Sequence, residues 1–234
     1  MSFYRGPKVV TEGLVLALDA ANHKSYPGSG TVWRDLSGNL NSGSLVNSPT
    51  FSSDKGGILS FNGTDEYVTI NDASSIDITG AITMEILFKA PNDTNIERLI
   101  TKDVSGGTYG YGYQFARYNN DKMLATYNNG ATRIFQYSND LGTGFASNYI
   151  HTMYCYDGSN SQKIWVNGVD ETGGVASFTP DFTGGSTSGT PLYLMRRGGE
   201  YAESDTAFVR LYNRGLTAEE VQQNYNATKG RFDL

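Results

Sequence analysis

Short runs of alternating apolar and polar residues, separated by turn-forming clusters, extend along most of the chain. From Ile82 to Phe88 every second residue is apolar, and this period of two predicts a long, half-buried strand. The segment 14–19 is apolar on both faces and also predicts a strand. Further strands are expected at 98–102, 111–118, 122–127, 132–137, 192–196 and 207–212.

Two more pairs of strands are separated by turn residues. Asn62-Gly63 lies between apolar segments at 58–61 and 66–70, and Asn-Gly is a strong hairpin signal. A second cluster, 157–160, lies between strands expected at 149–156 and 162–166. We therefore expect two hairpins here.

One segment has a helical pattern. Thr217 and Glu220 have the spacing of a capping box, and Ala218, Val221 and Tyr225 follow as a short apolar stripe. A helix is expected at about 217–228. Many short strands and one terminal helix predict an all-β fold, a single antiparallel β-sandwich over 13–234. Residues 1–12 form an N-terminal arm and a candidate docking segment.

Composition and charge exclude several classes of protein. The 234 residues carry 18 Lys and Arg against 24 Asp and Glu, a net charge of −6, which disfavours nucleic acid and anionic membranes as partners. Cys155 is the single cysteine, so no internal disulfide can form. The longest apolar run is too short to cross a membrane, and the first residues lack a signal-peptide pattern. We expect no nucleic-acid partner and no membrane insertion.

Three segments resemble the concanavalin A-like, laminin G-like jelly-roll family. Residues 58–70, ILSFNGTDEYVTI, resemble its early strand pair. Residues 149–158 with 163–168 resemble a later hairpin, and 208–221 resemble the closing strand and helix. The resemblance implies a two-sheet jelly-roll sandwich. It also implies structural roles: packing for Tyr67 and Trp165, turns for Gly63 and Gly168, and a helix cap for Thr217.

Both ends of the chain are similar to a narrower group, the laminin G-like structural proteins of tailed phages, especially phages of aquatic bacteria. The similar segments are 4–22, 25–39 and 224–232. This resemblance implies a non-enzymatic virion structural protein, such as a capsid decoration, neck, fibre or tail appendage. Its expected partners are capsid or tail subunits, further copies of the chain and host cell-surface glycans. The expected location is the virion, assembled in the host cytoplasm and released by lysis.

A free carbohydrate-binding lectin module is the main alternative, and a glycoside hydrolase is a third hypothesis. Laminarinase-type relatives carry E-x-D-x-x-E on one strand, which sets two carboxylates at the roughly 5–5.5 Å that retaining hydrolysis needs. The chain has no such run. His151 and Cys155 share a strand face but lie about 13 Å apart, too far for a thiol and its base. We predict no enzyme activity and no catalytic residues.

Calcium is the one cofactor that stays open. Carboxylate and amide oxygens of the kind that bind calcium are frequent in the predicted loops, but they follow no ligand motif, so no metal site is assigned. The residues are Asp19, Asn22, Asn62, Asp65, Asn92, Asp93, Glu203 and Asp205.

The candidate ligand-contact residues are Tyr109, Tyr111 and Tyr113, which alternate with glycine. Tyr118 ends the same expected strand, and Tyr127 lies in the next one. Exposed tyrosines stack on sugars or give a large contact area with a protein. The same alternation also fits core packing, so the sequence leaves sugar binding, a protein interface and packing open.

Overall fold

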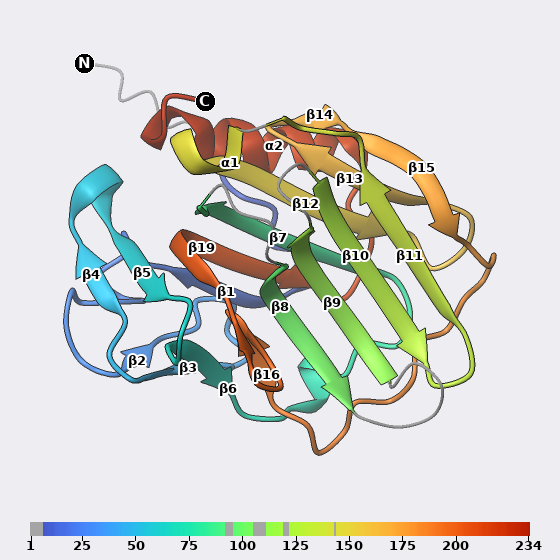
Figure 1. Cartoon of the computed structure of the whole chain (residues 1–234), viewed down its shortest axis with the longest axis horizontal. Coiled ribbons are helices and arrows are strands. Elements are labelled where there is room, and N and C mark those ends of the chain that lie inside the picture. The colour runs from blue at the N-terminus through green and yellow to red at the C-terminus, as the bar shows by residue number, and fades with distance from the viewer. Residues whose placement is uncertain (1–6, 92–95, 105–110, 119–121, 143) are drawn as a thin grey trace.

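Two large antiparallel sheets packed face to face make up the fold (Figure 1). The computed structural model describes residues 7–91, 96–104, 111–118, 122–142 and 144–234. The first sheet, called sheet A, has in the described residues the order β14 (Val169–Asp170), β13 (Gln162–Val166), β12 (Ile150–Tyr156), β7 (Ile82–Lys89), β19 (Glu203–Tyr212), β5 (Ile58–Asn62) and β4 (Thr50–Ser52), with β1 (Leu14–Asp19) also paired to β19.

The second sheet, called sheet B, lies in front of sheet A in the view of Figure 1. Its order is β15 (Thr172–Ser177), β11 (Arg133–Ser138), β10 (Lys122–Asn129), β9 (Tyr111–Tyr118), β8 (Glu97–Val104), β16 (Leu192–Leu194), β6 (Tyr67–Ile70), β3 (Gly43–Val46) and β2 (Val32–Trp33). A short ribbon pairs β17 (Arg196–Arg197) with β18 (Glu200–Tyr201). The helices are α1 (Gly144–Ser147) and α2 (Ala218–Thr228), with 3₁₀ turns at Asp54–Gly56, Ser74–Ile76 and Lys229–Arg231.

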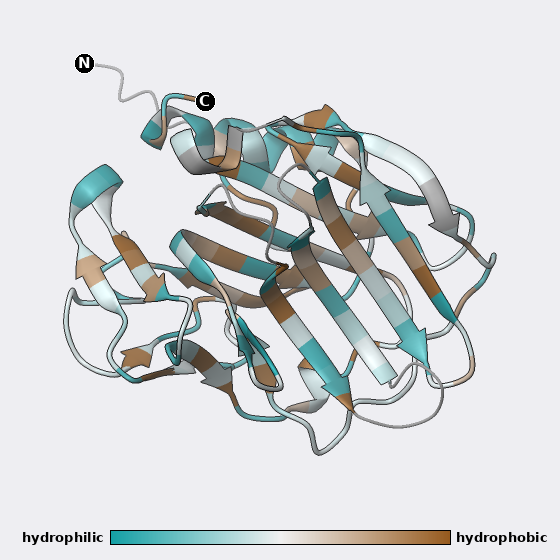
Figure 2. Ribbon diagram, in the orientation of Figure 1, coloured by the Kyte–Doolittle hydropathy of each residue, from teal (hydrophilic) through white to brown (hydrophobic). Residues whose placement is uncertain are grey.

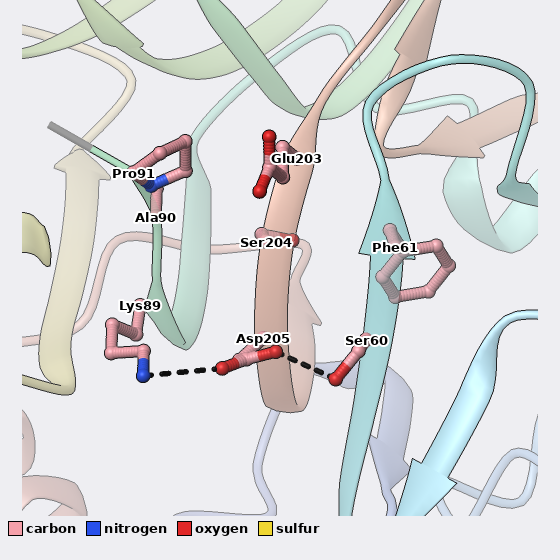
Figure 3. A pocket seen from close by; sticks show the side chains of 8 residues that line it. All are labelled: Ser60, Phe61, Lys89, Ala90, Pro91, Glu203, Ser204 and Asp205. Atoms are coloured by element: carbon pink, nitrogen blue, oxygen red, sulfur yellow. Dashed lines mark hydrogen bonds and ion pairs between the residues drawn. The ribbon is translucent and has the colours of Figure 1, made fainter. Parts of the chain in front are cut away.

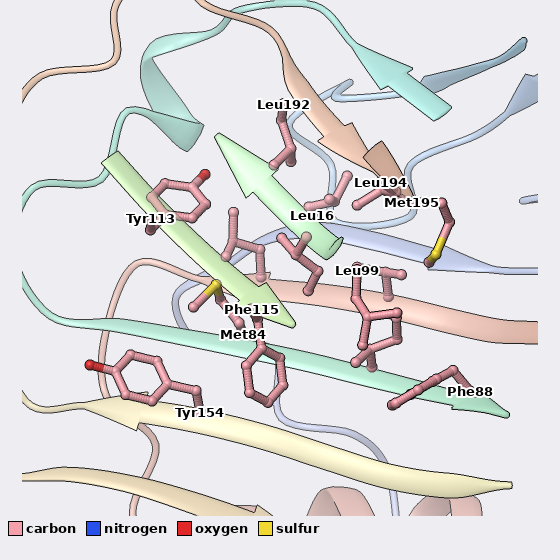
Figure 4. Packing of buried hydrophobic residues seen from close by; sticks show 14 of the residues in the cluster. Leu16, Met84, Phe88, Leu99, Tyr113, Phe115, Tyr154, Leu192, Leu194 and Met195 are labelled. Atoms are coloured by element: carbon pink, nitrogen blue, oxygen red, sulfur yellow. The ribbon is translucent and has the colours of Figure 1, made fainter. Parts of the chain in front are cut away.

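The main hydrophobic core fills the space between the sheets. Met84 and Phe88 of β7 belong to it together with Phe115 of β9 and Leu194 of β16, as Figure 4 shows. Hydrophobic and hydrophilic residues are interspersed along β8 and β11, as expected for strands with one face in a core (Figure 2). The predicted two-sheet sandwich with one C-terminal helix is confirmed.

A second layer covers the outer face of sheet A. Val221 of α2 packs with Met153 and Cys155 of β12 and with Trp165 of β13, and Val10 joins the same cluster. Because of this cover, β7 is buried on both faces and not half-buried as its period of two predicted. The alternating pattern located the inner face correctly, but an amphipathic strand does not reveal a helix lying over its other side.

The helix itself agrees with the sequence. The Thr217 side chain accepts a hydrogen bond from the Glu220 backbone, and the Glu220 side chain accepts one from the Thr217 backbone. The predicted capping box is therefore confirmed. A bidentate ion pair from Arg214 to Glu220, with its shorter N–O distance 2.6 Å, ties this cap to the end of β19.

One of the two predicted hairpins is correct and the other is wrong. β12 and β13 pair directly, with Thr152 opposite Val166. β5 and β6, by contrast, lie in different sheets: β5 pairs with β4 and β19, and β6 pairs with β3 and β16. The Asn62-Gly63 turn does form, with Gly63 at φ 69°. It carries the chain from one sheet to the other, because a turn sequence bends the chain without selecting the partners of its strands.

Candidate functional site

The two predicted contact tyrosines that the structure describes, Tyr111 and Tyr113, do not gather on the surface. Tyr109 lies outside the described residues. Tyr113 is fully buried, and its hydroxyl donates to the carbonyl of Ile76 at 2.9 Å. Tyr127, opposite it on β10, is also fully buried and donates to the carbonyl of Ile78 at 2.7 Å. Burial raises the pKa of both phenols. Tyr113 is thus a core residue and not a surface contact, because the inward face of β9 packs against sheet A.

Tyr111 occupies an intermediate position. Its side chain is half-buried, and its ring lies against Gly130 and Gly185, where any added side chain would collide with the ring. The ring therefore packs closely against two backbone segments at this end of β9. A contact role for Tyr111 stays a prediction.

The alternation along β9 instead directs other residues outward. Since Tyr113 faces the core, Gln114 and Tyr118 face the outer side of sheet B. The Tyr118 ring lies 5.2 Å from that of Tyr137 on β11, and Tyr137 lies 5.9 Å from Phe135. All three rings are half-buried. We call Tyr118, Phe135 and Tyr137 the β11 aromatic group.

A second aromatic group lies further along the same sheet. The Arg196 guanidinium carbon is 4.5 Å from the ring centre of Tyr67, 4.9 Å from that of Tyr193 and 5.8 Å from that of Tyr201. Each of these four side chains is half-buried. Gly198, at φ 58°, makes the turn of the β17–β18 ribbon and accepts a hydrogen bond from Arg196 Nε at 2.9 Å. We call Arg196, Tyr67, Tyr193 and Tyr201 the arginine–tyrosine group.

Bonded polar side chains lie between the two groups, on β8, β9 and the β17–β18 ribbon. Arg98 donates to Gln114 at 3.2 Å and to Glu200 at 3.1 Å. Gln114 and Arg197 both donate to Asp103, at 3.2 and 2.9 Å. These bonds hold the β17–β18 ribbon against the sheet. Neighbouring strands lie about 4.8 Å apart, so the five steps from β11 to β6 spread this face over about 24 Å.

Two hydroxyls next to Gln114 have no partner among the described residues. Thr101 on β8 and Thr126 on β10 stand opposite Gln114 on its two sides, and both are buried. Neither Oγ1 makes a hydrogen bond within the described part of the chain. Unpaired buried polar atoms are uncommon. These polar side chains are therefore buried at the centre of this face, and the more exposed polar groups lie beside them, on Arg197 and Glu200.

The surface also has a pocket of about 310 Å³ at one end of sheet A, shown in Figure 3. Lys89 and Asp205 stand opposite each other on β7 and β19 and form an ion pair of 3.3 Å. Ser60 donates to the same carboxylate at 2.6 Å. The ion pair occupies both of these charged groups, and Glu203 adds a second carboxylate to the lining of the pocket.

The buried carboxylates are engaged in structural bonds. Glu85, which the alternation on β7 placed on the outer face, is fully buried and binds Arg210 at 2.6 Å and His151 at 2.8 Å. Glu97 pairs with Arg117 at 3.4 Å and accepts the backbone N–H of Glu203 at 2.8 Å. Neither carboxylate is free to act as nucleophile or acid.

The lone cysteine is also inert in this arrangement. Cys155 is buried beneath α2, and burial raises the pKa of its thiol to about 12. Such a thiol stays protonated at neutral pH and is a poor nucleophile. The ring of His151 is held by Glu85 and stacks on Tyr225 with centroids 5.8 Å apart. The side chains of Cys155 and His151 therefore have structural roles.

The loop oxygens considered as calcium ligands mostly hold their own turns. Asn62 Oδ1 accepts from three successive backbone N–H groups, and Asp19 pairs with Arg231 at 2.9 Å. Asn92 and Asp93 lie outside the described residues. Where the structure describes the chain, no three His, Cys, Asp or Glu side chains converge as a metal site would require.

The interior does hold a cation surrounded by oxygen atoms, but this cation is a lysine side chain and not a metal ion. The ammonium of Lys102 is fully buried and bonds Asp72 at 2.6 Å, Asp77 at 3.1 Å and the carbonyls of Thr187 and Thr190. Sequence reasoning missed this lysine, because it falls in a strand with no distinguishing motif. It also missed the arginine–tyrosine group, whose one signal is the Gly-Gly turn at 198–199 between Arg and Tyr residues.

Comparisons with known proteins agree with this architecture. A laminin G family model, described as the concanavalin A-like lectin/glucanases superfamily, matches residues 62–222, which is more than half of the chain. No curated protein resembles the sequence at a significant level. None of the described helices is long and apolar enough to span a membrane.

Several solved structures have the same fold at low sequence identity. The binding domain of Paraclostridial Mosquitocidal Protein 1 is 12% identical with a TM-score of 0.71, and the match covers 93% of this chain and 52% of that one. The receptor-binding domain of botulinum neurotoxin C/D mosaic serotype is 11% identical with a TM-score of 0.69, over 92% and 51%. Trypanosoma rangeli sialidase, solved with sialic acid, is 14% identical with a TM-score of 0.64, over 94% and 34%. The chain thus spans about half the length of the toxin domains, and the likeness shows the fold alone.

Proposed function

Because the chain belongs to the concanavalin A-like lectin/glucanases superfamily, we propose that it is a non-catalytic binding module of a tailed-phage virion and that it binds glycans through the outer face of sheet B. One observation carries the choice of this face: two half-buried aromatic groups flank a hydrogen-bonding centre on it. Host-surface glycans are the proposed ligands, and capsid or tail subunits are the proposed attachment partners.

The β11 aromatic group and the exposed polar side chains of this face suit sugar recognition. Tyrosine and phenylalanine rings present flat apolar faces, on which the C–H face of a sugar ring packs, and Tyr side chains lose little conformational entropy on binding. Arg197 and Glu200, which are partly exposed on this face, supply a donor and an acceptor for hydroxyl groups. A face of about 24 Å is long enough for several linked sugar units.

The virion assignment rests on the resemblance of the chain ends to phage structural proteins. In the fold these ends come together: Val10 N–H donates to Asn224 at 2.8 Å, and Gln223 donates to the carbonyl of Lys8 at 2.7 Å. Two of the three segments that carry the resemblance, the described part of 4–22 and 224–232, therefore meet on the outer side of sheet A. A docking role for residues 1–12 stays a prediction.

Glycan binding is tested with the isolated protein on a glycan array. We expect binding that falls at least tenfold in Tyr118→Ala and Tyr137→Ala. Tyr149→Ala is the matched control, since Tyr149 is also half-buried and paired with an aromatic ring, that of Phe232, but lies away from sheet B. Equal loss in the control, or no binding by the native protein, contradicts the proposal for this face.

The virion role needs its own measurement. Mass spectrometry of purified particles should find this chain, and a particle reconstruction should contain density for its sandwich. A protein that is absent from particles but binds glycans is instead the free lectin module that the sequence left open.

A further inference from the structure

We propose that the arginine–tyrosine group anchors an acidic sugar, with the Arg196 guanidinium binding the carboxylate of a uronic or other carboxylated residue. The proposal rests on the glycan-binding function of the outer face and names the class of glycan. It follows from the surroundings of three neighbouring arginines on this face.

Two of these arginines are neutralised within the chain, and the third is not. Arg98 pairs with Glu200 at 3.1 Å, and Arg197 pairs with Asp103 at 2.9 Å. No ion pair among the described residues includes Arg196. Its nearest partners are three tyrosine rings and the carbonyl of Gly198. Three guanidinium groups therefore face two carboxylates, in a chain whose net charge is −6.

The geometry of Arg196 favours a planar anion. Rings of Tyr67 and Tyr193 stand 4.5 and 4.9 Å from the guanidinium carbon, and aromatic packing restricts the motion of the side chain. The Nε donor is used by Gly198, which leaves the donors at the end of the fork without a described carboxylate. A carboxylate accepts two parallel N–H bonds from such a fork, and a compact ammonium cannot reproduce that pattern.

The tyrosines would then bind the remainder of the same sugar residue. Tyr67 and Tyr193 lie 6.0 Å apart in an edge-to-face arrangement, and Tyr201 lies 6.0 Å from Tyr67 in a tilted one. All three ring centres lie within 5.8 Å of the guanidinium carbon. An acidic residue bound here leaves neighbouring sugar units directed along the sheet toward Gln114 and the β11 aromatic group.

The experiment compares matched acidic and neutral polysaccharides. The probes are polygalacturonate, alginate and hyaluronan, each beside its carboxyl-reduced form, with binding to the full chain measured by calorimetry at 0.15 M NaCl. We expect at least one acidic form to bind tenfold or more tightly than its reduced partner. Arg196→Gln should remove this preference, and Arg196→Lys should keep less than a third of it, because lysine retains the charge but not the fork.

Two controls separate recognition from folding. Arg133→Gln removes another arginine stacked on an aromatic ring of this face, at 4.6 Å from Phe135, and should keep the preference for the acidic form. The melting temperature of Arg196→Gln should stay within a few degrees of the native value. If that variant unfolds, Arg196→Lys, which retains the stem and the charge, replaces it in the comparison.

The outcomes distinguish the acidic-sugar inference from the proposed glycan-binding function. Equal binding to acidic and reduced forms, unchanged binding by Arg196→Gln, or preference for a sulfated control such as dextran sulfate overturns the carboxylate assignment and leaves glycan binding intact. Binding to none of the six probes overturns the acidic-sugar inference, and the glycan array then decides the proposed function separately.

Discussion

Glu85 offers the sharpest test of how the outer layer is held on sheet A. Its carboxylate is fully buried and joins three elements, since it binds Arg210 on β19 at 2.6 Å, His151 on β12 at 2.8 Å and Asn224 on α2 at 2.9 Å. Asn224 in turn accepts the backbone N–H of Val10. Replacing Glu85 therefore disturbs the strands, the helix and the N-terminal segment together.

Glu85→Gln keeps the shape of the side chain and removes its charge. Arg210, whose side chain is 7% exposed, then lacks its anion. Breaking a buried ion pair by removing one partner costs about 3–5 kcal/mol of unfolding free energy. Replacing both partners with apolar residues is usually neutral or stabilising, by about 1–4 kcal/mol relative to the pair. We thus expect a large loss in Glu85→Gln and a much smaller one in the double variant Glu85→Met/Arg210→Met.

The assay is urea unfolding followed by fluorescence of the buried residues Trp33 and Trp165. The reasoning is refuted if Glu85→Gln loses less than about 1 kcal/mol, the value of an exposed ion pair. It is equally refuted if the double variant loses as much as Glu85→Met and Arg210→Met together, because the pair would then act as two independent residues.

The same carboxylate predicts a dependence on pH. Burial raises the pKa of Glu85, but the combined lowering by Arg210 and His151 is larger. The pKa therefore lies below its ordinary value of 4.5. A group with a lowered folded pKa contributes stability that is complete above the unfolded pKa and is lost as the pH falls through the folded value. The unfolding free energy of the native protein should therefore decline below pH 4.5, and Glu85→Gln should lack this part of the decline.

Three further predictions concern other parts of the fold. Thr217→Ala should lower the unfolding free energy by about 1 kcal/mol, because it removes the cap of α2, while Thr217→Ser should retain most of it; thermal unfolding measures both. Lys102→Met should cost about 3 kcal/mol by breaking a buried pair, and NMR titration should find the pKa of Asp72 higher, since the hydrogen bond from Lys102 is the main cause of its lowering. A Lys102→Met variant that is as stable as the native protein would contradict the structural role of Lys102. Iodoacetamide should label Cys155 only in urea, because burial raises the thiol pKa to about 12; rapid labelling of the folded chain would contradict its burial.

Local patterns predicted most of the secondary structure. β9 has the bounds expected from the sequence, β12 and β13 pair as expected, and the capping box of Thr217 and Glu220 begins α2. These features depend on side-chain period and on residues a few positions apart, which the sequence displays directly. The short strands β2, β3, β4 and β15 were missed, because two to six residues without a clear alternation carry little local signal.

The candidate site depended on information that no local pattern contains. The sequence shows that Tyr113 and Tyr118 lie in one strand, but only the packing of sheet A against sheet B decides that Tyr113 is buried and that Tyr118 faces outward. The alternation on β7 likewise put Glu85 on an outer face, which α2 and the N-terminal segment then cover.

The sequence alone therefore determined where the longer alternating strands lie, where the helix begins and which fold family they resemble, because each depends on neighbours along the chain. Tertiary structure decided which strands pair across the Asn62-Gly63 turn, which tyrosines are accessible and which charges meet. Residues as distant as Tyr67 and Arg196 come within 4.5 Å only when β6, β16 and the β17–β18 ribbon assemble. Contacts of that kind depend on sheet order, and sheet order is set by burial over the whole domain.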